Sequence, residues 1–316
     1  MTGFIAQRLG ESLLVLLVMS FLIYGSIGLM PGDPIDLMIS ANPELTAADG
    51  ARLRALYGLD QPLLTRYLNW LGAAASGDLG YSRLFTQPVL EVLLPRLWNT
   101  VVLMGLSFAL ALVIAIPAGI IAALRPQSAL DNTVNLIAFA GISVPPFWLA
   151  ILFIILFAVT LGWLPAGGMG DSGAGFWEQL RHLILPVLTL TLATVGGIIR
   201  FMRAAMIEAL RQDYVRTARA KGVGTTRLVL GHALRNAMIP VVTILALNFG
   251  TLFSGALITE TMFGWLGMGK TIYDAIMGND FNLAMVGLLL ATLTTLLANV
   301  LADLIYAWLD PRISYR

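Results

Sequence analysis

Residues 100–124 read TVVLMGLSFALALVIAIPAGIIAAL, a run of 25 residues without a charged side chain. About 20 apolar residues in a helix cross the hydrocarbon core of a membrane, so this run is long enough to span one. Five further apolar stretches accompany it. The predicted spans are Leu13–Met30, Thr100–Leu124, Val134–Leu161, Leu183–Phe201, Ala237–Thr259 and Leu283–Leu309. The third contains Pro145-Pro146 and is expected to be one kinked helix.

The composition supports an all-α bundle of six transmembrane helices. Of the 316 residues, 58% are hydrophobic and 12% charged, and the mean hydropathy is +0.83. Soluble domains carry about 25% charged residues, so this chain would lack polar surface in water. It has no cysteine and two histidines, His182 and His232, which excludes thiol chemistry and argues against a catalytic or metal site. We therefore expect a membrane protein that is not an enzyme.

The first apolar stretch has two interpretations. It could be a signal peptide with Arg8 as its basic start. However, Glu11 precedes the apolar run, and Met30–Asp33 does not resemble a small-residue cleavage site. These features favour a retained helix.

The distribution of Lys and Arg predicts the orientation. Cations collect on the cytoplasmic side of membrane proteins. With a cytoplasmic amino terminus, 12 of the 19 cations lie inside and 7 lie in the longer outer segments. The inner set is Arg8, Arg125, Arg200, Arg203, Arg211, Arg216, Arg219, Lys221, Arg227, Arg235, Arg312 and Arg316. We therefore expect both termini in the cytoplasm.

A long hydrophilic segment, residues 31–99, is expected on the outer face between the first span (residues 1–30) and the remaining five (residues 100–316). Within it, Thr46–Asp49 resembles a helix-capping box, Gln61–Ala75 is amphipathic, and Gly77–Gly80 predicts a turn. Composition leaves two roles open, a solvated cap on the bundle or a docking surface for an extracytoplasmic partner.

A second hydrophilic segment, residues 203–236, is basic and expected in the cytoplasm. Its stretch Asp213–Gly222 predicts a helix that stops at a glycine. Contact with anionic lipid headgroups would account for the charge. The small residues Ala218, Ala220 and Gly224 favour a helix that fits closely against another protein.

Residues 264–271, GWLGMGKT, match the phosphate-binding pattern G-x-x-x-x-G-K-T. A true P-loop follows a strand, but this segment follows an apolar span and is expected on the outer face, where ATP is scarce. We interpret its glycines as allowing a tight loop that folds back toward the bundle.

The predicted spans contain hydroxyl and amide groups but almost no ionisable ones, whereas ion-coupled carriers place charges at membrane depth. Most of these mild polar groups are expected to tie helices together. A minority are expected to face a translocation path: Ser143, Thr194, Asn248, Thr251 and Ser254. Without a charge relay, the energy for transport must come from elsewhere.

Two cytoplasmic stretches, Arg216–Gly222 and His232–Pro240, resemble the EAA loop of binding-protein-dependent ABC importer permeases, specifically the B-type dipeptide/oligopeptide subunit. The resemblance covers the whole chain in order. Further matching stretches are Pro31–Pro34, Gly58–Pro62, Gly77–Gly80, Ser143–Trp148 and Glu260–Phe263. The general Glu-Ala-Ala positions are Arg216-Thr217-Ala218 here, a departure that the peptide branch shares.

The resemblance implies a type I ABC importer permease of the bacterial inner membrane that pairs with a second, homologous permease. It implies two ATPase subunits, which bind the ATP and Mg, so this chain needs no cofactor. The ATPases would dock on a coupling helix within residues 213–226. The implied coupling residues are Asp213, Tyr214, Arg216, Thr217, Ala218, Arg219, Ala220, Lys221 and Gly222.

The resemblance also implies an extracytoplasmic substrate-binding protein as a partner, besides membrane lipid, and no nucleic acid. A loop would project toward that binding protein through Phe263, Gly264, Trp265, Gly267 and Gly269. Dipeptides or oligopeptides are the implied cargo. Nickel chelates, glutathione, opine-like compounds and sugars remain alternatives within this fold type. An independent secondary carrier would require a buried charge or an inverted repeat, and neither is clear in the sequence.

Overall fold

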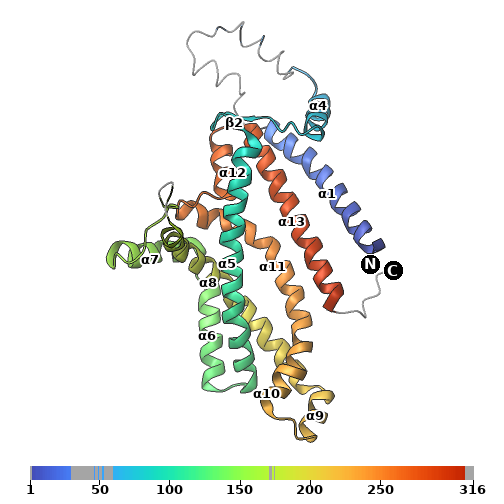
Figure 1. The fold of residues 1–316 in the computed structure, drawn as a ribbon, viewed down its shortest axis with the longest axis vertical. Coiled ribbons are helices and arrows are strands. Elements are labelled where there is room, and N and C mark those ends of the chain that lie inside the picture. The colour runs from blue at the N-terminus through green and yellow to red at the C-terminus, as the bar shows by residue number, and fades with distance from the viewer. Residues whose placement is uncertain are drawn as a thin grey trace. The chain divides into compact units, whose positions relative to one another are not determined.

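The computed structural model describes residues 2–29, 46, 49, 52, 60–170, 173 and 175–309 (Figure 1). The described chain is helical apart from a short antiparallel pair, β1 (Tyr81–Ser82) and β2 (Gln87–Pro88). It forms two compact units. The first comprises residues 1–97 and 271–294, and the second residues 98–270 and 295–316.

In the first unit, α1 (Thr2–Gly28) contacts α4 (Leu63–Ala75), where the hydroxyls of Ser20 and Tyr67 share a 2.8 Å hydrogen bond. The helix α4 confirms the amphipathic stretch predicted there. The unit also holds the start of α5 (Val89–Leu124), the end of α12 (Met268–Met277) and the first part of α13 (Phe281–Leu309). Because α5 begins at Val89, residues 89–99 are helical and continuous with the second predicted span.

Two local predictions for the outer segment are confirmed. The Thr46 hydroxyl donates to Asp49 Oδ2 at 2.6 Å, and the Asp49 amide donates back to the Thr46 hydroxyl at 3.3 Å. The Thr46 hydroxyl and the Thr46 amide, which also donates to Asp49 Oδ2, lower the pKa of the Asp49 carboxyl. Gly77 and Gly80 have φ angles of 92° and 82°, and the Gly80 amide donates to Asp78 Oδ1, which forms the expected turn.

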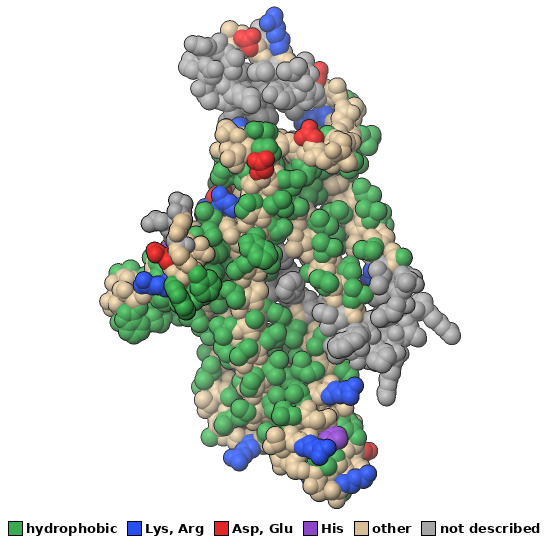
Figure 2. Space-filling model, in the orientation of Figure 1, with side chains coloured by type: hydrophobic (Ala, Val, Ile, Leu, Met, Phe, Trp, Pro, Cys, Tyr) green, Lys and Arg blue, Asp and Glu red, His purple; other side chains and the backbone are tan. Residues whose placement is uncertain are grey.

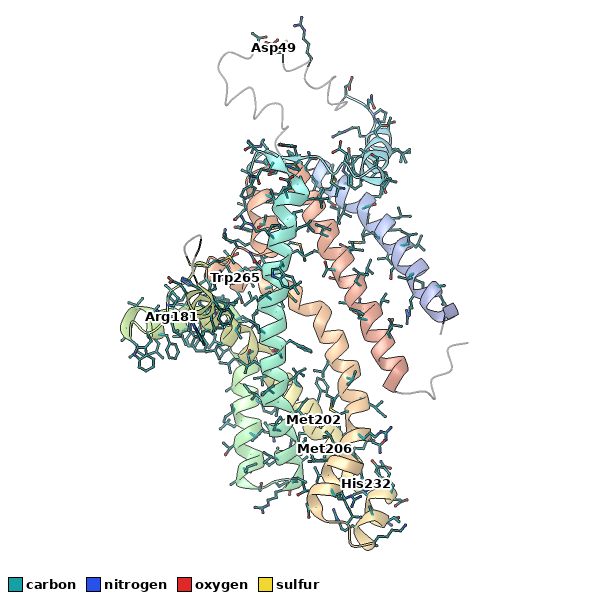
Figure 3. All side chains as sticks on the ribbon, in the orientation of Figure 1. Asp49, Arg181, Met202, Met206, His232 and Trp265 are labelled. Atoms are coloured by element: carbon teal, nitrogen blue, oxygen red, sulfur yellow. The ribbon has the colours of Figure 1, made fainter. Side chains whose placement is uncertain are left out.

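The second unit contains most of the bundle. Its elements after α5 are α6 (Ala129–Ser143), α7 (Pro146–Phe153), the π-helix η1 (Ile154–Thr160), α8 (Phe176–Arg211), α9 (Asp213–Ala220), α10 (Thr225–Arg227), the π-helix η2 (Leu228–Ala233) and α11 (Leu234–Met262). One apolar core joins α5, α6, α8, α9, η2 and α11, with Met202 and Met206 of α8 fully buried in it (Figure 3).

The described residues of the six predicted spans are mostly helical, and the third span is interrupted at its prolines. Four helical segments in the described part of the chain are long and apolar enough to cross a membrane: Ala6–Gly28, Val89–Leu124, Phe176–Arg211 and Phe281–Leu301. The predicted fifth span lies in α11, where the side chains of residues 246–255 are outside the described residues.

The third predicted span is not one kinked helix. Its two halves, Ala129–Ser143 and Pro146–Thr160, are bent by 98° at the prolines. Val144 is extended, with φ −90° and ψ 121°, because the ring of Pro145 disfavours helical backbone in the preceding residue. Pro145 is extended for the same reason, since Pro146 follows it. Two successive extended residues end α6 and start α7 in a new direction.

We expect Gly196→Ala to weaken the contact between α6 and α8. A Cβ at Gly196 would lie 2.3 Å from the carbonyl oxygen of Ala138, so the helices would have to separate. Overpacking of this kind costs about 1–3 kcal/mol. Thermal unfolding of the purified protein in detergent should show a clear loss of stability. Gly197→Ala is the matched control, since nothing lies within 4 Å of its Cβ. Equal stability of both variants would contradict the close contact.

Candidate functional site

The predicted coupling segment forms α9, a separate short helix that directly follows α8. Val215 is fully buried and Ala218 is 8% exposed, and both belong to the apolar core of the second unit. All other residues of α9 are exposed. Two apolar side chains three positions apart lie on one helix face, so this face attaches α9 to the bundle and the opposite face is available to a partner.

The end of α9 is a Schellman motif. The Val223 amide donates to the Ala218 carbonyl at 3.2 Å, and the Gly222 amide donates to the Arg219 carbonyl at 3.0 Å. Gly222 has φ +78°, which glycine adopts without steric cost. Val223 packs against the core beside Ala218, which completes the motif. The predicted glycine stop is confirmed, and it ends the helix at Ala220.

Positive charge surrounds the exposed face of α9. Figure 2 shows Lys and Arg side chains gathered at this end, close to a histidine. The exposed cations of the segment are Arg211, Arg216, Arg219, Lys221, Arg227 and Arg235. Asp213 contacts Arg216 at 3.4 Å, but both side chains are at least 75% exposed, so the pair contributes little stability. The surface suits a partner with acidic groups.

A partly buried ion pair joins α8 to α6. The Arg203 guanidinium binds Asp131 through two nitrogens, with Nη2 at 2.6 Å from Oδ2. Asp131 is 1% exposed and also accepts from the Gln127 amide and the Asn135 side chain, each at 2.8 Å. Sequence reasoning counted Arg203 among the cytoplasmic loop cations and missed this pair. The sequence offered one indication of this pair, which is that Asp131 is a single acidic residue in the first turn of an otherwise apolar helix.

A second buried carboxylate, Glu260 at the end of α11, organises the segment that resembles a P-loop. Its side chain is fully buried, the Thr100 hydroxyl donates to Oε1, and the Lys270 amide donates to Oε2 at 2.9 Å. A Cβ at Gly267 would lie 2.0 Å from Oε1. The segment follows a helix and wraps around an internal carboxylate. This agrees with the interpretation that it is not a P-loop but a loop that folds back toward the bundle.

The residues predicted to face a binding protein do not form an exposed tip. Phe263 is 1% and Trp265 4% exposed. The Trp265 indole donates to the Asn99 carbonyl at 3.1 Å, and the Gly168 amide donates to the Phe263 carbonyl at 2.7 Å. Gly264 (φ +60°) and Gly269 allow these turns and contacts. The aromatic side chains point inward because they fill the space among α5, α8 and residues 163–170.

The predicted translocation-path residues are not brought together by the described contacts. The hydroxyl of Ser143 donates to Phe139 and that of Thr194 to Leu190, so each bonds within its own helix. The side chains of Asn248, Thr251 and Ser254 lie outside the described residues. Their role stays a prediction.

Comparison with known proteins finds a matching family model, and relatives that align over nearly the whole chain. Residues 115–315 match the family described as binding-protein-dependent transport system inner membrane component. A putative peptide permease of Brucella suis is 42% identical over 316 residues, 99% of each chain. A glutathione transport system permease protein, GsiC of Escherichia coli O6:H1, is 39% identical over the full length of both.

A solved structure with a similar fold is a chain of the MetNI methionine ABC transporter in an inward-facing conformation. It has a TM-score of 0.59 and 20% identity, and the match covers 71% of this chain and 98% of that one. At this identity the likeness concerns the fold alone.

We expect Gly267→Ala to destabilise the protein. The added methyl group would collide with the Glu260 carboxylate, which cannot move without leaving Thr100 and Lys270 without their acceptor. The expected loss is about 1–3 kcal/mol. Gly231→Ala is the control, because the nearest atom to its Cβ is 4.0 Å away. Thermal unfolding in detergent measures both, and an unchanged midpoint for Gly267→Ala would refute the tight enclosure of Glu260.

Proposed function

The chain belongs to the binding-protein-dependent transport system inner membrane components, and from this premise we propose that it is the permease subunit of an ATP-driven peptide importer. The observation that carries the mechanism is α9, a helix with two buried apolar residues and an otherwise exposed, basic surface. We propose that ATPase subunits dock on this surface and move the bundle through it.

The coupling residues in this proposal are the exposed residues of α9 together with Lys221 and Gly222, which end the helix. Arg216, Arg219 and Lys221 would contact acidic groups of the ATPase, while Asp213, Tyr214, Thr217 and Ala220 would line the contact. Gly222 sets the direction in which the chain leaves. Because α9 follows α8 after the single residue Gln212, a displacement of α9 acts directly on the long helix α8.

The remaining subunits follow from the family. A second, homologous permease would complete the path, two ATPases would bind ATP and Mg, and an extracytoplasmic protein would deliver the cargo. This chain would bind no cofactor and hydrolyse no ATP. Both termini and α9 would face the cytoplasm, as the distribution of cations predicts. Closure of the ATPases would open the path outward, provided the two states differ in packing between the permeases.

Peptides are the proposed cargo, because the similar Brucella suis protein carries that name. Glutathione is the second candidate, on the basis of the similar Escherichia coli protein. Uptake of labelled dipeptides, longer peptides and glutathione by cells with and without the intact system distinguishes them. Uptake of none of these would reject the proposed cargo class.

We expect Gly222→Pro to uncouple ATP hydrolysis from transport. Proline cannot adopt φ +78° and lacks the amide that donates to Arg219, so the end of α9 would rearrange. Peptide uptake should fall by roughly tenfold or more, since such a change costs about 3 kcal/mol locally. The control is Gly224→Pro, whose φ of −61° already suits proline. Normal uptake with Gly222→Pro in a properly inserted protein would show that α9 is not the coupling helix.

We expect the double variant Arg216→Glu/Arg219→Glu to lose its ATPase partners. Both cations are exposed, so their reversal should repel an acidic groove without disturbing the buried Val215 and Ala218. Co-purification of ATPase from native membranes measures the effect. Arg125→Glu, an exposed cation in the α5–α6 turn, is the matched control. Equal recovery of ATPase with both variants would contradict charge-assisted docking.

A further inference from the structure

The bent pair α6–α7 places a helix across the direction of the bundle. The 15 residues of α6 rise about 22 Å, less than the roughly 30 Å of hydrocarbon in a bilayer. Within the second unit, α6 runs beside the long helix α5, and the chain then turns by 98° into α7 (Figure 1). If α5 and α6 follow the membrane normal, α7 and η1 lie near the membrane plane, in the leaflet opposite α9.

One side of α7 and η1 attaches to the bundle. Ala150 is fully buried against Leu185 of α8 and Phe263, with Phe153 and Phe157 packed around them. The other side is exposed and consists of bulky apolar residues: Phe147, Trp148, Ile151, Leu152, Ile155, Leu156 and Val159. Contacts between membrane helices favour small residues that allow close approach. A face of bulky side chains is better suited to lipid chains.

Aromatic side chains continue from this face to the start of α8. Trp163, Phe176 and Trp177 are 62%, 71% and 75% exposed. Tryptophan gathers at the boundary between hydrocarbon and headgroups. Arg181 lies within this group and donates to the Trp163 carbonyl at 3.0 Å. The exposed aromatic side chains therefore mark the depth at which lipid headgroups begin.

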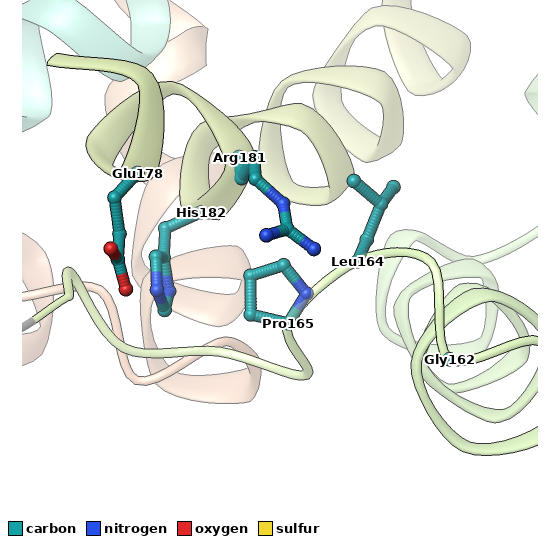
Figure 4. A pocket seen from close by; sticks show the side chains of 6 residues that line it. All are labelled: Gly162, Leu164, Pro165, Glu178, Arg181 and His182. Atoms are coloured by element: carbon teal, nitrogen blue, oxygen red, sulfur yellow. The ribbon is translucent and has the colours of Figure 1, made fainter.

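An open cavity of about 280 Å³ lies at this boundary, lined by Gly162, Leu164, Pro165, Glu178, Arg181 and His182 (Figure 4). One acidic and one basic side chain, Glu178 and Arg181, point from the same helix toward its rim (Figure 4). The His182 ring is held by a 2.9 Å hydrogen bond between Nδ1 and the Gly167 carbonyl oxygen. An exclusively anionic ligand would be repelled by Glu178, whereas a zwitterion would satisfy both charges.

We propose that this region is a binding site for a zwitterionic, amine-bearing phospholipid, with phosphatidylethanolamine as its chemical type. The phosphate would lie at Arg181, the ammonium group at Glu178, and the acyl chains along the exposed face of α7 and η1. The site is independent of the coupling helix and of the cargo. A lipid bound there would link the amino-terminal end of α8 to the bent pair α6–α7.

The chain contains no cysteine, which allows a single reporter to be introduced into the full transporter. A fluorophore on Trp177→Cys, in the complex reconstituted into phosphatidylcholine vesicles, reports on nearby lipid. The quenchers are acyl-chain nitroxide forms of phosphatidylethanolamine, phosphatidylglycerol and phosphatidylcholine. The control site is Leu136→Cys on α6, which is 70% exposed.

We expect phosphatidylethanolamine to quench the fluorophore at position 177 roughly threefold more effectively than the other two lipids, the scale of one exposed ion pair. Position 136 should show no preference among headgroups. In a Glu178→Gln background, the preference at 177 should shift toward phosphatidylglycerol, because this exposed carboxylate in the first turn of α8 is the proposed partner of the ammonium group. Arg181→Gln should weaken quenching by both.

Three results would overturn the proposal. Equal quenching by all three lipids at position 177 would leave only unspecific lipid contact. Absence of quenching by any lipid would mean that a protein covers this face. A preference that persists in both the Glu178→Gln and Arg181→Gln backgrounds would place the headgroup elsewhere. Gel filtration of each variant, with retained peptide uptake, excludes misfolding as the cause.

Discussion

The close contact between α6 and α8 is the constraint on which the second unit depends. Gly196 lies against the carbonyl of Ala138, and Gly119 of α5 lies against Met202 and the Ile199 carbonyl of the same helix. Helix α8 has 36 residues and contains Pro186, and these close contacts lie between Gly196 and Met202. Its amino-terminal end carries the cavity with Arg181 and His182, and its carboxyl-terminal end leads into α9. A single helix therefore connects the cavity with the segment that precedes α9.

Three carboxylates of the described chain are deeply buried, Asp131, Glu260 and Asp280, and each accepts hydrogen bonds from protein donors. Asp131 is neutralised by Arg203 and lies at the first turn of α6. Glu260 is enclosed by donors from residues far apart in the sequence. Asp131 and Glu260 each join the end of one helix to another element. These contacts give each carboxylate a structural role, since each joins elements that are distant in the sequence.

Glycine serves two opposite needs in this chain. At Gly222 it provides a backbone angle that ends α9 while leaving open space around it. At Gly267 it provides the absence of a side chain, so that the backbone can close over Glu260. Glycine therefore occurs at an exposed turn in one place and at a tightly packed loop in the other, and only the surrounding residues distinguish the two.

The sequence alone determined the properties that depend on neighbouring residues. Apolar runs predicted the spans, and Gly222 predicted the end of α9, because helix hydrogen bonds and caps are local. The tertiary structure decided what depends on distant residues. Thr100 is 160 positions from Glu260, so no local pattern could show that Gly264–Gly269 enclose a carboxylate or that Phe263 and Trp265 point inward. Pro145 and Pro146 predicted a kink in the third span. The 98° angle between its two halves depends on how α7 packs on α8 and α11.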